Sequence, residues 1–187
     1  MISVILDTET TGLIKPGCVP LDQQPHIIEI GVIKVKDGVG IDELSMLIKP
    51  PVKISDEITK ITGITNAMVE DKDGFSSAAH MLLAFLSDAD VIIAHNAPFD
   101  LGCLGFEFER YTCKIHSNVF NSFIKTKQIV CTVNHYIPRY NRVMSLKKLY
   151  ADIMGKELKQ THRALDDCLA LSDILNKDGF FGPQDQI

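Results

Sequence analysis

Apolar runs separated by polar turns predict three strands in the first third of the chain. Residues 1–6 are apolar and rich in β-branched side chains, which is typical of a buried strand. Residues 27–35 predict a second strand, and Asp37-Gly38, a pair typical of hairpin turns, leads into a third at about 44–48. The polar residues 7–12 are expected to end the first strand in a turn.

Helical signals begin near residue 55 and alternate with strand signals from there. Ser55 is a suitable N-cap and Gly63 a suitable stop, which predicts a short helix between them. A second helix is expected to start at Ser76 or Ser77. Residues 91–94 are wholly apolar and predict a short strand, and a helix follows from about residue 98, a proline suited to a first turn.

The last third of the chain continues this alternation. Residues 129–130 predict a strand, 145–154 a helix that starts at Ser145 and ends before Gly155, and 164–175 a final helix. A meander of three strands followed by alternating strands and helices predicts an α/β fold, with a ribonuclease-H-like mixed sheet flanked by helices. The length suits one domain over residues 1–187, with a short tail from about 179 to 187.

Composition and charge narrow the class of protein. The sequence is 45% hydrophobic and 23% charged, as in ordinary globular proteins, and no apolar run approaches the roughly 18 residues of a membrane span. The net charge is −5, but residues 114–163 hold ten Lys and Arg against two acids. That segment is either a face that grips phosphates, set against an acidic remainder that holds metal ions, or an ordinary solvated surface.

Cysteine usage points away from disulfides and zinc. The five cysteines are scattered, their number is odd, and no C-x-x-C pair occurs. This pattern favours a reducing, cytoplasmic location, with most of the cysteines buried as small apolar residues.

Two acids are expected side by side at the end of the first strand. Asp7 and Glu9 are two residues apart, so on a strand both point to the same face. Like charges so close raise each other's pKa unless a cation neutralises them. A third acid, Asp100, follows the strand at 91–94 and falls in the first turn of a helix. Each acid alone has an ordinary explanation, as a turn residue or as an acid favoured by the helix dipole.

A histidine and a fourth acid are expected around the start of the last helix. His162 and Asp167 are five residues apart, about 140° around a helix, so they cannot share a face if both are helical. We expect His162 on the preceding loop, where it could accept a proton as a general base, and Asp167 in the first turns. Alone, His162 would be interpreted as an exposed loop histidine. His95 is expected to be a core or capping histidine.

Taken together, the acids and the histidine indicate a metal-dependent function that none of them indicates alone. Acids at the ends of core elements together with a histidine on a loop predict a site for hard divalent cations and an activated water. Oxygen ligands suit Mg²⁺ or Mn²⁺ and not Zn²⁺. Two such ions can stabilise both the attacking and the leaving oxygen in a phosphodiester displacement.

The three clusters also resemble a known family. The motifs at 7–13 (DTETTGL), 95–100 (HNAPFD) and 162–167 (HRALDD) are similar to the exonuclease motifs of the DEDDh family. This is the DnaQ-like group that includes the proofreading ε subunit of bacterial DNA polymerase III. The segments at 27–32 and 61–65 resemble it as well, so the similarity runs from about residue 2 to residue 176.

The resemblance implies roles for individual residues. Asp7, Glu9, Asp100 and Asp167 would hold two Mg²⁺ or Mn²⁺ ions, with Asp7 bridging them, and His162 would deprotonate the attacking water. Asp166 would then be a neighbour of the site and not a ligand. The resemblance also implies that the terminal nucleotide contacts Thr10, Leu13, Ile61, Thr62, Asn96 and Phe99. Alternatively, Leu13 and Phe99 are simply core residues.

The implied function is 3′→5′ exonucleolytic removal of nucleoside 5′-monophosphates from a single-stranded DNA end. The Thr10-Thr11 pair resembles DNA-directed members more than the Glu-Met-Thr run of oligoribonucleases. The alternatives are an exoribonuclease acting on short RNA or tRNA ends, a non-catalytic binding module, and a phosphatase or nucleotidase. The ε subunit has a long tail for its polymerase, whereas this sequence ends soon after its last helix. A stand-alone or phage-like nuclease is therefore expected beside a proofreading one.

Overall fold

A mixed five-stranded sheet forms the centre of the computed structural model, which describes residues 1–111, 114–159 and 162–182. The strand order is β3-β2-β1-β4-β5; β1, β2 and β3 pair antiparallel, whereas β4 and β5 run parallel to β1. This topology confirms the predicted fold class. The strands are β1 (Ile2–Thr10), β2 (Ile27–Lys36), β3 (Val39–Leu47), β4 (Val91–Ala94) and β5 (Gln128–Cys131).

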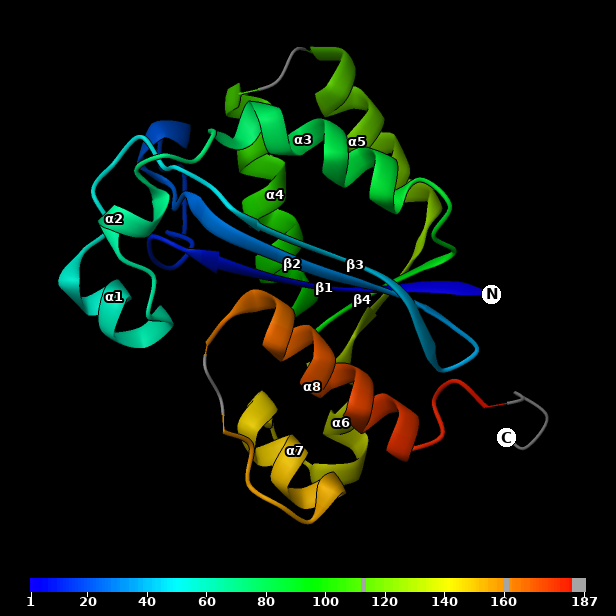
Figure 1. Ribbon diagram of the computed structural model, residues 1–187. Coiled ribbons are helices and arrows are strands. Elements are labelled where there is room, and N and C mark those ends of the chain that lie inside the picture. Colours follow the sequence, from blue (N-terminus) through cyan, green and yellow to red (C-terminus); the bar gives the residue numbers. More distant parts are fainter. Residues whose placement is uncertain (112–113, 160–161, 183–187) are drawn as a thin grey trace.

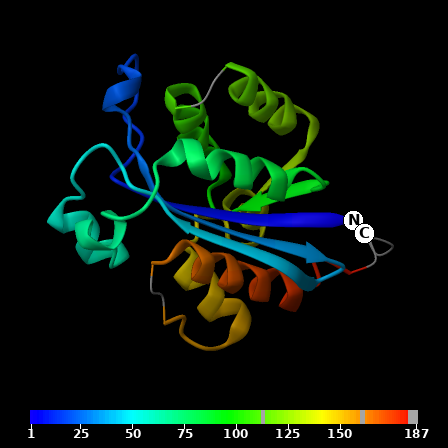
Figure 2. The same cartoon turned by 45° about the horizontal axis from the view of Figure 1, so that its top comes forward.

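Helices cover both faces of the sheet (Figure 1). One layer contains α3 (Phe75–Leu86), α4 (Ala97–Tyr111) and α5 (Lys114–Thr126), and the opposite layer contains α6 (Thr132–Tyr140), α7 (Leu146–Met154) and α8 (Ala164–Lys177). Two short helices, α1 (Asp56–Thr62) and α2 (Asn66–Val69), lie beyond the end of β1. The loop that carries the 3₁₀ turn η1 (Leu21–Gln23) projects from the body beside α4 (Figure 2).

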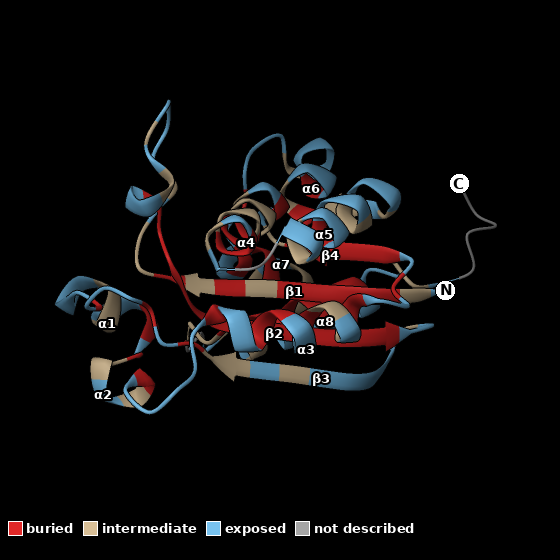
Figure 3. Ribbon diagram, turned by 90° about the horizontal axis from the view of Figure 1, so that it is seen from above, coloured by how far each residue is buried: buried red, intermediate tan, exposed pale blue. Residues whose placement is uncertain are grey.

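Alternating side chains of the central strands divide the core in two. Val4 and Leu6 of β1 pack with α3 and α4, whereas Ile5 and Ile33 face the layer of α6, α7 and α8. Figure 3 shows that the inner strands are buried along most of their length. Strand β1 is thus covered on both faces, which fixes the positions of the polar residues at its end.

The first strand is longer than predicted. Residues 7–10 were expected to turn, but they continue β1 and pair with β2 as far as Thr10, where a bulge follows Glu9. The ladder of backbone hydrogen bonds to β2 outweighs the polar character of these side chains. Thr8 and Thr10 point into the buried side, while Asp7 and Glu9 occupy the other face.

The predicted hairpin is confirmed, although its second strand begins earlier than expected. Asp37 and Gly38 both have positive φ, 52° and 81°, as a type I′ turn requires. This turn connects β2 directly to β3, which begins at Val39 and not near residue 44. The first residues of this edge strand are exposed, and Gly40, Asp42 and Glu43 interrupt the apolar run that marks a buried strand.

Three helices were not predicted, namely α2, α5 and α6. Helix α5 buries a single side chain, Phe120, and α6 contains Pro138 and few strong helix formers, so tertiary packing determines both. The capping signals were more reliable. The Ser55 hydroxyl accepts a hydrogen bond from the Ile58 N–H, and Gly63 ends α1 with φ of 71°.

The expectation that most cysteines are buried is met in part. Cys103 and Cys168 are buried, but Cys18 is exposed and Cys131 is half-buried, while Cys113 lies outside the described residues. The predicted tail is described only as far as Gly182, and residues 183–187 lie outside the described part. Among the described helices, none is long and apolar enough to cross a membrane.

Arg110 at the end of α4 fastens the projecting loop to the body. Its guanidinium donates to the carbonyls of Leu21, Gln24 and Pro25, with N···O distances of 2.8 Å to each. It also lies 3.0 Å from the buried carboxylate of Glu107. Glu107 in turn accepts the Ile27 N–H, so one ion pair joins the loop, α4 and the start of β2.

Removing Arg110 should destabilise the fold strongly. Arg110→Ala leaves the Glu107 carboxylate buried without its guanidinium, so we expect the free energy of unfolding to fall by about 3–5 kcal/mol. Urea denaturation monitored by circular dichroism measures this loss. The double variant Glu107→Gln/Arg110→Met removes both charges and should recover at least half of it. A double variant as unstable as Arg110→Ala would show that the loop contacts, and not the buried charge, carry the stability.

Candidate active site

Strand β1 presents two acids on the face that looks toward α8. Asp7 and Glu9 are both half-buried. In the antiparallel pairing of β1 with β2, Asp7 lies opposite Gly31 and Glu9 lies opposite Glu29. Gly31 has no side chain, so the space beside Asp7 is open to the backbone of α8. The two acids predicted to lie together on one strand face do so.

Helix α4 brings a third acid to the same place. Asp100 lies in the first turn, as predicted, and is 2% exposed. Its Oδ1 accepts hydrogen bonds from the Thr8 amide at 3.0 Å and from the Thr8 hydroxyl at 2.8 Å. Asn96 precedes the helix with a φ of 78°, and its carbonyl accepts the Phe99 N–H. Thr8, located between Asp7 and Glu9 in the sequence, therefore fixes Asp100 against β1.

Helix α8 supplies the fourth acid, and the loop before it supplies the histidine. Asp167 is buried in the first turn, and His162 lies ahead of the helix with a φ of 50°, a left-handed conformation that is uncommon for histidine. Ligand atoms of Glu9, His162 and Asp167 all lie within 4.8 Å of one another. The structure thus places both residues on the elements predicted for them.

The electrostatics of these acids reflect burial and mutual repulsion. Burial, followed by the charges of Asp100, Glu9 and Asp167, raises the pKa of Asp7 well above its ordinary value. Burial and the neighbouring acids raise the pKa of Glu9 to about 8. Burial raises the pKa of Asp100 to about 7, although the two hydrogen bonds from Thr8 oppose this shift.

The donor set fits hard divalent cations. Carboxylates from β1, α4 and α8 lie close together, and the charges of Glu9, Asp100 and Asp167 raise the pKa of Asp7. The imidazole of His162 lies beside Glu9 and Asp167. Oxygen donors with an accumulated negative charge are the ligands that Mg²⁺ and Mn²⁺ prefer. Asp7, Glu9, Asp100 and Asp167 are the residues that could hold such ions.

Two further residues support the site and were not singled out from the sequence. Glu29 on β2 is 1% exposed, and its carboxylate accepts hydrogen bonds from the Arg163 guanidinium and the Ala164 N–H. An acid inside an otherwise apolar strand was the available signal. Arg163 stands beside the predicted His162, at the end of the basic segment, and its guanidinium is paired with Glu29.

The residues implied to contact a nucleotide differ in exposure. Leu13 is 81% exposed and Ile61 50% exposed, so neither is a core residue, and Asn96 is exposed as well. Phe99 is half-buried against the core, and the Thr10 hydroxyl donates to the Gly12 carbonyl. Thr62 is buried, with its hydroxyl hydrogen-bonded to Ile58 and Ile64. Its side chain is therefore used inside the fold.

The basic segment does not form one face. Residues 114–163 pass from α5 in one layer, through β5, to α6 and α7 in the other (Figure 1). Arg139 is paired with Asp178 at 2.6 Å, just as Arg163 is paired with Glu29. Of the two interpretations left open for this segment, its course across the sheet and these two ion pairs favour an ordinary solvated surface over one continuous phosphate-binding face.

His95 is a structural histidine, as expected. Its ring nitrogens lie 3.0 Å from the Thr132 hydroxyl and 3.0 Å from the Met144 carbonyl oxygen. Burial lowers its pKa, so the neutral ring joins the end of β4 to the first residue of α6 and to the segment before α7.

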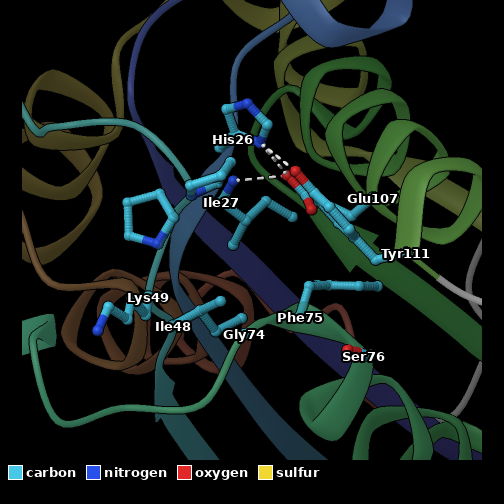
Figure 4. A pocket seen from close by; sticks show the side chains of 11 residues that line it. His26, Ile27, Ile48, Lys49, Gly74, Phe75, Ser76, Glu107 and Tyr111 are labelled. Atoms are coloured by element: carbon cyan, nitrogen blue, oxygen red, sulfur yellow. Dashed lines mark hydrogen bonds and ion pairs between the residues drawn. The ribbon is translucent and has the colours of Figure 1, made fainter.

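A cavity of about 260 Å³ lies away from these acids. It opens between the start of β2, residues 48–51 and the facing ends of α3 and α4, and none of the predicted site residues lines it. Glu107 points toward His26 and Ile27 at one end of the cavity (Figure 4). The Glu107 carboxylate in this cavity thus belongs to the loop anchor.

Comparison with known proteins identifies the family. The chain matches the RNase T exonuclease family over residues 4–175. It is 31% identical over 172 residues to the PolC-type DNA polymerase III of Clostridium perfringens, covering 92% of this chain and 11% of that protein. It is 29% identical to the ε subunit of DNA polymerase III from Pasteurella multocida, covering 91% of this chain and 65% of that protein. The chain therefore spans about a tenth of the PolC-type relative.

Solved structures agree with this result. Exonuclease X in complex with 5′-overhanging duplex DNA has a TM-score of 0.60 and 26% identity, covering 95% of this chain and 93% of that one. The nuclease domain of 3′hExo, a DEDDh family member bound to rAMP, has a TM-score of 0.73 and 18% identity, covering 95% and 92%. The chain therefore belongs to the RNase T family of exonucleases, in the DnaQ-like (DEDDh) group of divalent-metal-dependent phosphodiester hydrolases.

Proposed function

We propose that this chain is a 3′→5′ exonuclease that hydrolyses single-stranded DNA ends to nucleoside 5′-monophosphates. The observation that carries the proposal is the convergence of Glu9, His162 and Asp167, whose ligand atoms lie within 4.8 Å of one another. Glu9 comes from the first strand, whereas His162 and Asp167 come from a loop and the helix after it, which are far from Glu9 in the sequence. A group of acids that raise each other's pKa has no structural benefit of its own.

Asp7, Glu9, Asp100 and Asp167 are proposed as the residues that would hold two Mg²⁺ or Mn²⁺ ions. When bound, such ions supply Lewis-acid polarisation of the phosphodiester and activation of water. These four residues would hold such ions through their ionised carboxylates. Thr8 keeps Asp100 oriented toward β1 through its two hydrogen bonds, so this carboxylate does not need to reorganise.

His162 is proposed as the general base. A base must lie within hydrogen-bond reach of the water that it deprotonates, and the His162 ring nitrogens lie beside Glu9 and Asp167 at the edge of the cluster. A ring nitrogen takes the proton from the attacking water and later passes it to solvent. Because His162 lies on the loop before α8, its side chain can adjust when substrate binds.

The terminal nucleotide is proposed to contact exposed apolar side chains next to the acids. Leu13 and Ile61 are large apolar residues left open to solvent, and Phe99 is half-buried in the first turn of α4. A base that stacks on such side chains buries their apolar surface, and aromatic contacts are tolerant of base identity. Asn96 and the backbone near Thr10 remain for polar contacts to the sugar.

DNA is the favoured substrate for two reasons. The Thr10-Thr11 pair follows the metal-binding acids, where oligoribonucleases carry Glu-Met-Thr. The relatives PolC and the ε subunit are parts of DNA polymerase III, and Exonuclease X was solved with DNA. We propose a role in proofreading or as a stand-alone nuclease, with the domain spanning residues 1–187.

Oligonucleotide degradation tests the function and its need for metal. With Mn²⁺ or Mg²⁺, a 5′-labelled single-stranded DNA should shorten one nucleotide at a time, and a 3′-labelled one should release labelled monophosphate first. EDTA should abolish both reactions, and Asp7→Asn should reduce them to background because a carboxylate needed for the cations is lost.

The exposed Glu109→Gln on α4 is the matched control and should act as fast as wild type. Internal cuts, release of the 5′ label first, or full activity in EDTA would contradict the proposal. An RNA of the same sequence, degraded faster than the DNA by tenfold or more, would identify an exoribonuclease instead.

The raised pKa values predict how stability changes with pH. Glu9 and Asp100 titrate near 8 and 7 in the fold, above the ordinary 4.5 and 3.8, so burial favours their protonated forms. The stability from these protonated groups is present at low pH and is lost as pH rises through about 7 to 8. Metal-free protein should therefore melt at least about 5 °C lower at pH 8.5 than at pH 6.

Metal should reverse this trend, and substitution should flatten it. Thermal unfolding with Mg²⁺ or Mn²⁺ should show a larger rise in Tm at pH 8.5 than at pH 6, because ionised carboxylates bind the cations. Asp100→Asn should reduce the pH dependence of the metal-free protein, whereas Glu109→Gln should leave it unchanged. Equal metal-induced shifts at the two pH values would contradict a site made of these acids.

His162→Ala should slow turnover without loosening the complex. We expect kcat to fall by about 10²–10⁴-fold, the usual contribution of a general base, with KM and the metal requirement unchanged within about threefold. The ascending limb of the wild-type pH–rate profile should disappear. His80→Ala on α3, in the opposite layer, is the control. A His162→Ala enzyme with most of its activity and the same pH profile would remove His162 from the mechanism.

A further inference from the structure

Glu29 carries a carboxylate that is buried inside the sheet. Among the described residues, its hydrogen-bond partners come from the start of α8. It is 1% exposed on β2, where it faces Glu9 across the antiparallel ladder. An isolated buried charge is strongly unfavourable unless it is paired and hydrogen-bonded. The groups that satisfy it come from the start of α8, 134 residues further along the chain.

Two consecutive residues immediately after His162 bind this one carboxylate. The Arg163 Nε lies 3.0 Å from both oxygens of Glu29, and a terminal guanidinium nitrogen donates to Oε1. The Ala164 N–H donates to Oε2 at 2.9 Å. Because Ala164 is the first residue of α8, this carboxylate also lies at the positive end of the helix dipole.

The same contacts constrain the residues on either side. His162 has a left-handed backbone, φ 50°, directly before the fixed guanidinium. A non-glycine residue keeps such a conformation only when its surroundings hold it there. After Arg163 in the sequence, the Asp167 N–H donates to the Arg163 carbonyl at 3.0 Å. The contacts that fix Arg163 therefore also constrain the backbone of Asp167.

Strand β2 also leaves room for α8 at one position. A Cβ on Gly31 would lie 2.3 Å from the Ala164 carbonyl carbon and 2.3 Å from the Leu165 nitrogen, so the helix backbone rests directly on the glycine. Glu29 and Gly31 are two residues apart and share a strand face. One provides the charge and the other the space, and together they set where the first turn of α8 lies.

We infer that Glu29 and Arg163 are positioning residues for catalysis, which hold the His162 loop and the first turn of α8 against β2 so that the imidazole reaches the reacting water. This inference rests on the proposed function, because it gives Arg163 a purpose only if His162 takes part in the reaction. A guanidinium used in this way is not available to bind phosphate, although Arg163 is 35% exposed. Its effect should therefore appear in kcat and be transmitted through His162.

A double-mutant cycle between Arg163 and His162 tests the inference. Arg163→Ala should lower kcat on single-stranded DNA about 10- to 100-fold, since small displacements of a catalytic group are costly, with KM and the Mn²⁺ requirement unchanged within about threefold. In the His162→Ala background, the same substitution should change the single-turnover rate by less than about twofold. Arg139→Ala, which removes an arginine–carboxylate pair at the other end of α8, is the matched control and should leave kcat unchanged.

Arg163→Lys covers the case in which the alanine variant fails to fold. Lysine keeps the charge beside Glu29 but cannot donate from two nitrogens of one plane, so kcat should fall at least about threefold with a Tm near wild type. That loss should also vanish in the His162→Ala background. Additive losses, a rise in KM with kcat unchanged, or a wild-type rate in Arg163→Lys would overturn the inference. If His162→Ala itself keeps its activity, the proposed general base fails instead, and the two failures are distinguishable.

Discussion

Repulsion among carboxylates at the end of β1 is the constraint on which the rest of the structure depends. Asp7 meets Glu9, Asp100 and Asp167 there, with Glu29 close by, and the charge of each of these four neighbours raises the pKa of Asp7. Such a cluster persists only if the scaffold fixes its members independently of their mutual interaction. Two hydrogen bonds from Thr8 fix Asp100, and the Arg163 guanidinium holds Glu29.

The two-sided core supplies that rigidity. Apolar side chains of β1 alternate between the layer of α3 and α4 and the layer of α6, α7 and α8, so the strand cannot rotate or slip without exposing them. A slip by one residue would move Asp7 and Glu9 to the opposite face. The acids are therefore located by packing several residues away. Helix α8 then reaches its place through the close backbone contact at Gly31.

The sequence could predict those features that local rules control, and it failed where distant contacts decide. Ser55 and Gly63 bound α1, and Asp37-Gly38 forms the turn that its residue types require. The end of β1 was misjudged because pairing with β2 overrides the polar character of residues 7–10. The partner of Arg163 could not be found from spacing, since Glu29 lies 134 residues earlier. The placement of the four metal-binding candidates was predictable because Asp7 and Glu9 alternate along one strand, and Asp100 and Asp167 each lie in the first turn of a helix.

Charge balance links the proposed cations to the arrangement of the site. Five carboxylates, when all are ionised, carry five negative charges, and the Arg163 guanidinium beside them carries one positive charge. The pKa of Glu9 remains near 8 despite the Arg163 charge that lowers it, so one guanidinium does not compensate the cluster. Four negative charges are left, which two divalent cations would balance and a single one would not. Because Arg163 is committed to Glu29 by its planar hydrogen bonds, it neutralises the one acid of the five that is not among the proposed metal ligands. The four other carboxylates are thereby left to the ions, and the same ion pair holds the histidine beside them.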